Sequence, residues 1–158
     1  MKRLKAYIET SVWNFLLSDK APEKRAATEV FFRSAETDRY RIFISEVVAT
    51  EIDDAPTEIR MKLLSTIDRY TPEFLAPDEE SDRMIEEYLN GGLLSNNHLV
   101  DLSHLAIASV NDMDMLVSWN LKHLVKSRTR MLANAINRKN GYHEIEICTP
   151  EEAIESED

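Results

Sequence analysis

Four side chains with oxygen donors stand out in the 158-residue sequence because each lies in or beside a short apolar segment. Glu9 and Asn120 come just after two such segments, whereas Glu51 and Asp101 lie in segments of helical periodicity that follow or flank others. Carboxylates that are held together repel one another, and a divalent cation is the usual remedy. An all-oxygen donor set suits Mg²⁺ or Mn²⁺ better than Zn²⁺.

Divalent ions of this kind neutralise charge and activate water in phosphodiester hydrolysis, often as a pair about 3.5–4 Å apart. If the four side chains meet, the sequence therefore predicts a phosphodiester hydrolase.

Each residue also has a structural alternative. Glu9 could be a surface acid, and Glu51 could be a solvated helix residue. Asp101 could be a helix N-cap worth about 1 kcal/mol, and Asn120 could be a turn residue.

The elements that must position these residues follow from apolar periodicity. Short buried runs predict strands, and stripes with a spacing of about 3.6 residues predict helices. The predicted strands are residues 6–8, 42–44, 74–76, 115–117 and 144–148. The predicted helices cover about residues 12–16, 22–35, 46–52, 59–70, 79–90, 101–110 and 128–138.

Strands that alternate with helices indicate a mainly parallel sheet with helices on both faces. Ligands bind such sheets at the C-terminal ends of the strands, so we expect the oxygen donors to converge there. Ser45 is the predicted N-cap of one helix, and Thr10 or Ser11 is expected to cap the helix after Glu9. The segment between the second and fourth strands is interpreted as a helical insertion or arm.

The charge distribution bears on nucleic-acid binding. The net charge of −10 counts against it, because phosphate contacts need Lys and Arg. Residues 121–143, however, contain no Asp or Glu. This block could hold an anionic ligand, or it could be an ordinary solvated helix face. Its basic residues are Lys122, Lys126, Arg128, Arg130, Arg138 and Lys139.

Length and cysteine usage predict one domain in a reducing compartment. The only cysteine, Cys148, cannot form an internal disulfide and lies in an alternating apolar run, which favours a buried structural thiol. No apolar run approaches the roughly 20 residues that span a bilayer. The basic start of the chain lacks a long apolar segment, so no signal peptide is expected. A cytoplasmic location, away from membranes, is the resulting prediction.

Four segments of the chain resemble, in order, the motifs of PIN domains. In residues 7–13, Tyr-Ile-Glu-Thr-Ser-Val-Trp, an acid followed by Thr or Ser closes the first strand. Residues 45–52 resemble the second motif, and residues 101–108 match an Asp-x-x-His-x-Ala-x-Ala pattern. Residues 118–124 resemble the fourth, where Asp or Asn follows Ser or Thr. The resemblance covers nearly the whole chain.

This resemblance implies a PIN-like three-layer α/β/α sandwich with a mainly parallel central sheet, as a single domain over residues 1–158. It implies an endoribonuclease that depends on Mg²⁺ or Mn²⁺ and hydrolyses RNA through metal-activated water. Such proteins are most often the toxins of VapBC-type toxin–antitoxin pairs. The partners implied are therefore an RNA substrate, a small antitoxin and a second copy of the chain in a homodimer.

The resemblance also implies roles for particular residues. The catalytic and metal-binding set would be Glu9, Glu51, Asp101 and Asn120. Groups that orient these ligands or water would be Thr10, Ser11, Ser118 and His104. RNA would lie along residues 122–139, with contacts from Lys122, Lys126, Arg128 and Arg130.

Three aromatic side chains near the motifs have alternative roles. His104 could help to order the site or be a packed core histidine, and His123 is equally open. Trp119 could be structural or could stack on a base.

Glu9 departs from the motif, in which the first acid is usually Asp. The extra methylene moves the carboxylate by about one carbon–carbon bond, whereas catalytic geometry tolerates about 0.5 Å. Either the backbone adjusts, or metal affinity and rate fall. The second hypothesis is therefore a catalytically weakened PIN-like module that binds RNA or protein. A receiver-like phospho-acceptor domain is a third, but it needs an acidic pair after the first strand and a Lys near the last, which this sequence lacks.

Overall fold

Strands and helices alternate along the chain in the computed structural model, which describes residues 3–155. Short apolar runs form the strands, and amphipathic segments form the helices between them. In chain order the elements are β1 (Leu4–Ile8), α1 (Thr10–Leu17), α2 (Pro22–Glu36), β2 (Tyr40–Ser45), α3 (Glu46–Asp53), α4 (Thr57–Tyr70), β3 (Glu73–Leu75), α5 (Glu79–Asn90), the 3₁₀ turn η1 (Asn96–His98), α6 (Leu99–Val110), β4 (Met115–Val117), α7 (Ser127–Lys139), β5 (Glu146–Cys148) and α8 (Pro150–Glu155).

The five strands form one parallel sheet in the order β3-β2-β1-β4-β5. The central strand β1 pairs with β2 on one side, where Tyr7 lies opposite Phe43, and with β4 on the other, where Ile8 lies opposite Val117. Tyr7, Ile8 and Val117 are fully buried. Parallel strands that are covered on both faces have this continuous apolar character.

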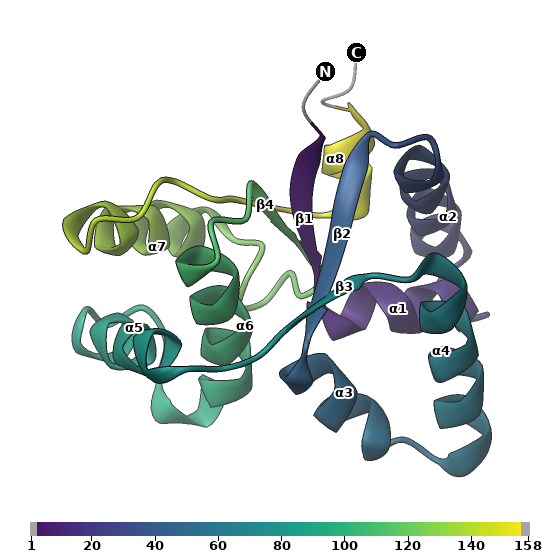
Figure 1. Cartoon of the computed structure of the whole chain (residues 1–158), viewed down its shortest axis with the longest axis horizontal. Helices are drawn as coiled ribbons and strands as arrows, with labels where there is room; N and C mark the ends of the chain where they lie inside the picture. Colours follow the sequence, from purple (N-terminus) through teal and green to yellow (C-terminus); the bar gives the residue numbers. More distant parts are fainter. Residues whose placement is uncertain (1–2, 156–158) are drawn as a thin grey trace.

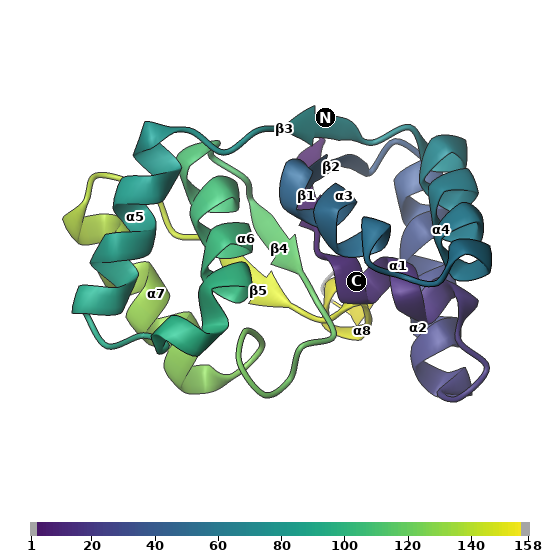
Figure 2. The same ribbon diagram turned by 90° about the horizontal axis from the view of Figure 1, so that it is seen from below.

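Helices cover both faces of the sheet (Figure 1). Viewed from below, α5, α6 and α7 lie on one side of the strands, and α1, α2 and α4 lie on the other (Figure 2). The predicted three-layer α/β/α sandwich is therefore confirmed, and every strand pair is parallel. Within residues 3–155, no helix has both the length and the apolar character needed to cross a membrane.

The segment between β2 and β4 is part of the sandwich. β3 forms an edge strand beside β2, with Phe74 opposite Ile44. α6 buries Leu102 and Leu105, and α5 packs against α6. A buried network joins α5, α6 and α7, because the Tyr88 hydroxyl donates to Asn137 Oδ1 at 2.6 Å and bonds Ser109 Oγ at 3.1 Å. Of the helices interpreted from sequence as an insertion or arm, α5 and α6 thus help to cover one face of the sheet, and α4 lies on the other (Figure 2).

The strand order brings the ends of β1 and β4 together. The chain moves outward from β1 through β2 to β3 and then returns to the other side of β1 as β4. In open parallel sheets, such a reversal of direction is where ligands bind, beyond the C-terminal ends of the strands. Glu9 follows β1 at this edge, and Ser118 follows β4.

Cys148 is 1% exposed at the end of β5 and forms no disulfide, as expected for a structural thiol. Burial, together with the carboxylates of Glu146 and Glu152, raises the pKa of this thiol to about 12. The neutral thiol therefore predominates at neutral pH, and the side chain acts as a small apolar group.

Candidate functional site

Glu9 caps the helix that follows it. Its Oε2 accepts a hydrogen bond from the backbone N–H of Ser11 at 3.0 Å, so Glu9 is the N-cap of α1. The sequence predicted Thr10 or Ser11 in that role, and this prediction is wrong. The glutamate side chain is long enough to fold back onto the first turn, which leaves both hydroxyls available for other acceptors.

The buried carboxylate of Glu9 accepts three hydrogen bonds. Glu9 is 5% exposed. Its Oε1 accepts from Ser11 Oγ at 2.6 Å and from Ser118 Oγ at 2.5 Å. Such charge-assisted bonds offset the cost of removing a carboxylate from water. Ser118 lies 109 residues away in the sequence, so this arrangement depends on β1 and β4 being neighbours.

Glu51, which belongs to α3, lies beside Glu9. Its Oε1 accepts from Thr10 Oγ1 at 2.6 Å and lies 2.6 Å from Nε2 of His104. Glu9, Glu51 and His104 each offer one possible ligand atom, and these three atoms lie within 4.8 Å of one another. Burial raises the pKa of Glu51, but the hydrogen bond and charge of His104 and the bond from Thr10 outweigh it, so the net pKa is lowered.

His104 is held by a buried chain of hydrogen bonds. Its Nδ1 lies 2.6 Å from the Tyr7 hydroxyl, which lies 2.7 Å from Ser45 Oγ. Because an ionised Glu51 can only accept, Nε2 donates to it, while Nδ1 forms the other hydrogen bond of the ring, with Tyr7. Both ring nitrogens are therefore occupied. The side chain is a packed core histidine and also orients a site carboxylate, which unites the two roles considered from sequence.

Asp101 belongs to an adjoining group of side chains. Its Oδ1 accepts from Asn120 Nδ2 at 3.1 Å, and its Oδ2 lies 3.8 Å from His98 Nδ1. The helix expected to start at Asp101 starts two residues earlier, at Leu99, because η1 leads directly into it. Asp101 thus lies in the first turn of α6.

Asn120 connects Asp101 to the turn after β4. The side-chain Oδ1 of Asn120 accepts from the backbone N–H of His123 at 3.0 Å. The backbone N–H of Asn120 donates to Ser118 Oγ at 2.9 Å. Ser118 Oγ therefore contacts both Asn120 and Glu9. The four predicted ligands form two adjoining parts, Glu9 with Glu51 and Asp101 with Asn120, which Ser118 bridges.

The two parts are coupled electrostatically. Burial is the main cause of the raised pKa of Asp101, and the negative charge of Glu9 raises it further. The imidazoles of His104, His123 and His98 oppose this shift. The effect of Glu9 on Asp101 is the repulsion expected between carboxylates that share a site without a cation.

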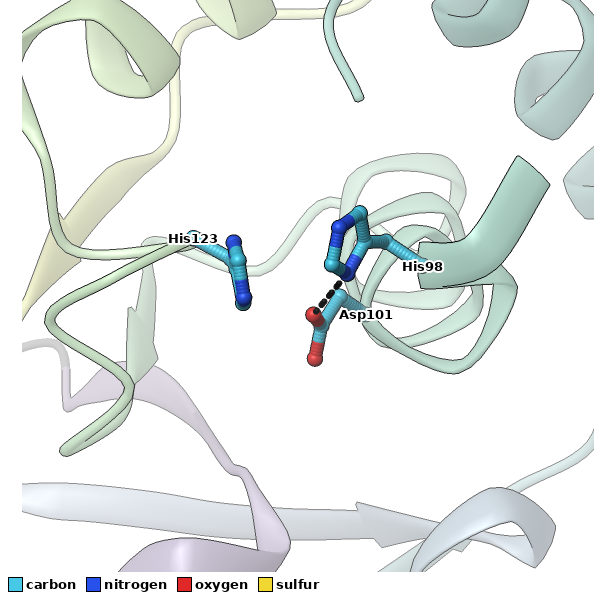
Figure 3. Close-up of side chains that lie close together, drawn as sticks. All are labelled: His98, Asp101 and His123. Carbon is cyan, nitrogen blue, oxygen red and sulfur yellow. Dashed lines mark ion pairs between the residues drawn. The ribbon is translucent and has the colours of Figure 1, made fainter. Parts of the chain in front are cut away.

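His98 is a site residue that the sequence did not single out. Figure 3 shows it at the start of α6, with Asp101 beside it and His123 facing both from the turn after β4. The ring centroids of His98 and His123 are 4.0 Å apart at an interplanar angle of 39°. The spacing of three residues between His98 and Asp101 was a usable signal, because it places both side chains on one helix face.

Trp119 is structural. It is 7% exposed, and its Nε1 donates to Thr28 Oγ1 at 2.8 Å. Its ring meets Phe15 edge-on, with centroids 5.9 Å apart. A side chain packed in this way has no free face for a base.

The four basic residues predicted to contact RNA differ in their surroundings. The Arg128 guanidinium donates to the backbone carbonyls of Leu93 and Gly92. Arg130 pairs with Glu152 through two hydrogen bonds. Lys122 and Lys126 are exposed, and neither forms an ion pair within residues 3–155.

Comparison with known proteins finds solved structures with a similar fold. No protein-family model and no curated protein matches the sequence. A chain of the crystal structure of VapBC2 from Rickettsia felis, bound to a DNA fragment from their promoter, superposes with a TM-score of 0.58 at 15% identity. The match covers 92% of this chain and 98% of that one. Tyrosyl-tRNA synthetase from Archaeoglobus fulgidus, complexed with L-tyrosine, gives a TM-score of 0.50 at 11% identity, over 94% of this chain and 56% of that one. At these identities the likeness establishes the fold.

Proposed function

We propose that this chain is a divalent-metal-dependent endoribonuclease of the PIN type and the toxin of a toxin–antitoxin pair. One observation carries the proposal: Glu9 and Glu51 come from separate elements, yet their ligand atoms lie within 4.8 Å at the C-terminal edge of a parallel sheet. Asp101 adjoins them closely enough for Glu9 to raise its pKa. The fold shared with a chain of VapBC2 supports the same assignment.

The donor set fits a hard divalent cation. Glu9 and Glu51 lie together and Asp101 adjoins them, and none of the three carboxylates has a Lys or Arg side chain among its hydrogen-bond partners in residues 3–155. Both hydrogen bonds of Glu51 use Oε1, so Oε2 is available as a ligand. Mg²⁺ and Mn²⁺ prefer such oxygens. When bound, the ion would neutralise charge on the phosphate and make water a stronger nucleophile.

The chain's own residues would hold and orient the ligands. Glu9, Glu51, Asp101 and Asn120 are the proposed ligand set. Among their supports, Ser11 and Ser118 fix the Glu9 carboxylate, and Thr10 and His104 fix that of Glu51. Supports of this kind typically change metal affinity or activity by about 10–100-fold when mutated.

The capping role of Glu9 accounts for the longer acid at the first position. The side chain curls back onto the N–H of Ser11, which takes up the length of the additional methylene. The three hydrogen bonds that Glu9 accepts, one from the Ser11 N–H and two from the Ser11 and Ser118 hydroxyls, favour the second candidate function. That function is a catalytically weakened PIN-like module that binds RNA or protein. A carboxylate held by three hydrogen bonds has less freedom to reorganise around an ion.

The proposal predicts RNA cleavage that requires Mg²⁺ or Mn²⁺ and stops with EDTA. Asp101→Asn should lower the cleavage rate about 100-fold or more, since it removes a proposed ligand that no neighbouring acid replaces. Asp82→Asn, on the exposed side of α5, is the matched control and should cleave normally. Gel assays on a purified RNA give the rates. Equal cleavage by the two variants, or cleavage that survives EDTA, would contradict the proposal.

Glu9→Asp separates the two candidate functions. If the native site is active but attenuated, the shorter acid should increase Mn²⁺-dependent cleavage. If the chain is a binding module, neither form should cleave RNA, and Mn²⁺ should not raise the melting temperature of either.

The remaining parts of the proposal concern partners and location. We propose a small antitoxin protein, a homodimer and a cytoplasmic site of action. Co-expression with a small protein encoded beside this chain, followed by purification of the complex and loss of cleavage, tests the antitoxin. Light scattering of the isolated chain tests the dimer, and a monomer mass would remove that part.

A further inference from the structure

A second set of possible ligands, distinct in chemistry from the carboxylates, lies beside the acidic site. His98 ends η1, Asp101 lies in the first turn of α6, and His123 lies in the turn after β4 (Figure 3). Each offers one ligand atom, and the three atoms lie within 4.8 Å of one another. All three residues are half-buried, so an ion could reach them from solvent.

Asn120 holds this group, because its side-chain carboxamide forms hydrogen bonds with both Asp101 and the backbone of His123. Nδ2 of Asn120 donates to Oδ1 of Asp101, and Oδ1 of Asn120 accepts from the backbone of His123. Oδ2 of Asp101 is then left facing His98 Nδ1, at 3.8 Å. Ligands held by supports outside the coordination sphere are typical of protein metal sites.

Two imidazoles and one carboxylate suit a different ion from the neighbouring carboxylates. Imidazole nitrogen favours Zn²⁺ and the later first-row ions, whereas carboxylate oxygen suits Mg²⁺ and Mn²⁺. A tetrahedral Zn²⁺ with bonds of about 2.0–2.1 Å places its ligand atoms roughly 3.4 Å apart. The one pair of these atoms with a stated separation, His98 Nδ1 and Asp101 Oδ2, is 3.8 Å apart, close to that value.

The first group does not compete for such an ion through its histidine. His104 is fully buried, and both its ring nitrogens are occupied, Nδ1 by Tyr7 and Nε2 by Glu51. The side chains of His98 and His123 have no hydrogen bond to another residue within 3–155 beyond the ion-pair contact of His98 with Asp101. Their nitrogens are therefore the available imidazole donors at this edge of the sheet.

We propose that His98, Asp101 and His123 form a Zn²⁺ site that shares Asp101 with the acidic site. Zn²⁺ bound there withdraws Asp101 from the Mg²⁺ or Mn²⁺ ligand set and so inhibits the ribonuclease. The inhibition rests on the proposed function, but binding of Zn²⁺ does not. The chain thus carries a metal-dependent off state within its own active site.

Metal binding is measured on the full chain after EDTA treatment and dialysis. A calorimetric titration with Zn²⁺ should show one binding site per chain. Bound Co²⁺ should give visible absorption bands, and added Zn²⁺ should abolish them. His98→Ala and His123→Ala should each weaken Zn²⁺ binding about 10-fold or more. His143→Ala removes an exposed histidine near Asp112 and should bind Zn²⁺ like the native chain.

The variants are expected to fold. His98 makes no side-chain cap bond to α6, and the His123 ring makes no hydrogen bond within residues 3–155. Circular dichroism and melting temperature check this. Unchanged Zn²⁺ binding when both His98 and His123 are alanine would place the ion elsewhere and overturn the site, as would absence of binding to the native chain.

Sharing of Asp101 is tested without cleavage. Added Zn²⁺ should release bound Mn²⁺, seen as growth of the free Mn²⁺ signal in electron paramagnetic resonance, and His98→Ala should prevent this release while still binding Mn²⁺. Zn²⁺ that binds without displacing Mn²⁺ would overturn the sharing. If the chain proves to lack ribonuclease activity, these two measurements still decide the Zn²⁺ site.

Discussion

At the scale of single residues, the carboxylates of this site differ in how well their charge is compensated. Glu9 receives three hydrogen bonds and Glu51 receives two, from Thr10 and His104. Asp101 receives one, from Asn120 at 3.1 Å, and its pKa is raised. The protein therefore retains at Asp101 a charge that costs folding free energy, as residues kept for binding often do.

The raised pKa of Asp101 predicts that Asp101→Asn stabilises the metal-free protein. A carboxyl group with a raised folded-state pKa contributes stability below its ordinary value of 3.8 and loses it as pH rises through the folded pKa. At pH 7 in EDTA, the variant should therefore melt at a higher temperature than the native chain. The difference should shrink towards pH 4. Calorimetric scans at both values test this, and a lower melting temperature at pH 7 would contradict it.

At the scale of elements, the junction of β2 and α3 connects stability to the site. Ser45 Oγ accepts from the N–H of Val47 at 3.1 Å and caps α3, as the sequence predicted. The same hydroxyl bonds Tyr7, which in turn orients His104. The cap that starts the helix of Glu51 is therefore also the first link in the chain that holds its carboxylate.

Ser45→Ala should cost about 1–2 kcal/mol, because it removes an N-cap and leaves the buried Tyr7 hydroxyl with one partner fewer. The melting temperature should fall by roughly 2–8 °C. Thr66→Ala removes only an exposed hydroxyl bond to Lys62 within α4 and serves as the control. Chemical denaturation of both variants measures the free energies of unfolding. Equal values would show that this hydroxyl does not support the fold.

At the scale of the whole molecule, some residues of the basic block have partners within the fold and others are exposed. Arg128 and Arg130 join parts of the fold, one to the segment after α5 and the other to α8. Lys122 and Lys126 are exposed in the segment between β4 and α7, two and six residues after Asn120. In a chain of net charge −10, these two lysines are the predicted contacts for an RNA backbone that reaches the carboxylates.

Replacing Lys122 and Lys126 together by alanine should weaken RNA binding and its dependence on salt. Loss of two phosphate contacts should lower the slope of log K against log salt by about 1.4 for single-stranded RNA. Arg130→Ala is the comparison, because its charge is already paired with Glu152. Fluorescence anisotropy in EDTA measures binding without cleavage. An unchanged slope for the double variant would exclude this surface.

Local patterns in the sequence predicted most of the elements. The strands around Tyr7 and Leu116 and the cap at Ser45 follow from apolar runs and one hydroxyl, which depend on near neighbours alone. Local reasoning erred at Glu9 and Asp101. At Glu9 a long side chain displaced the expected cap, and before Asp101 a 3₁₀ turn moved the helix start.

The sequence by itself singled out the oxygen donors that are candidate cation ligands, though not His98, and predicted on which kind of element each of them lies. Only the tertiary structure decided which of them meet. The order of the strands brings Ser118 to Glu9 across 109 residues and lets Asn120 hold Asp101. It also brings His98 against His123. Periodicity records which face of an element is buried, whereas contact between distant side chains depends on how whole elements pack, and no local pattern encodes that.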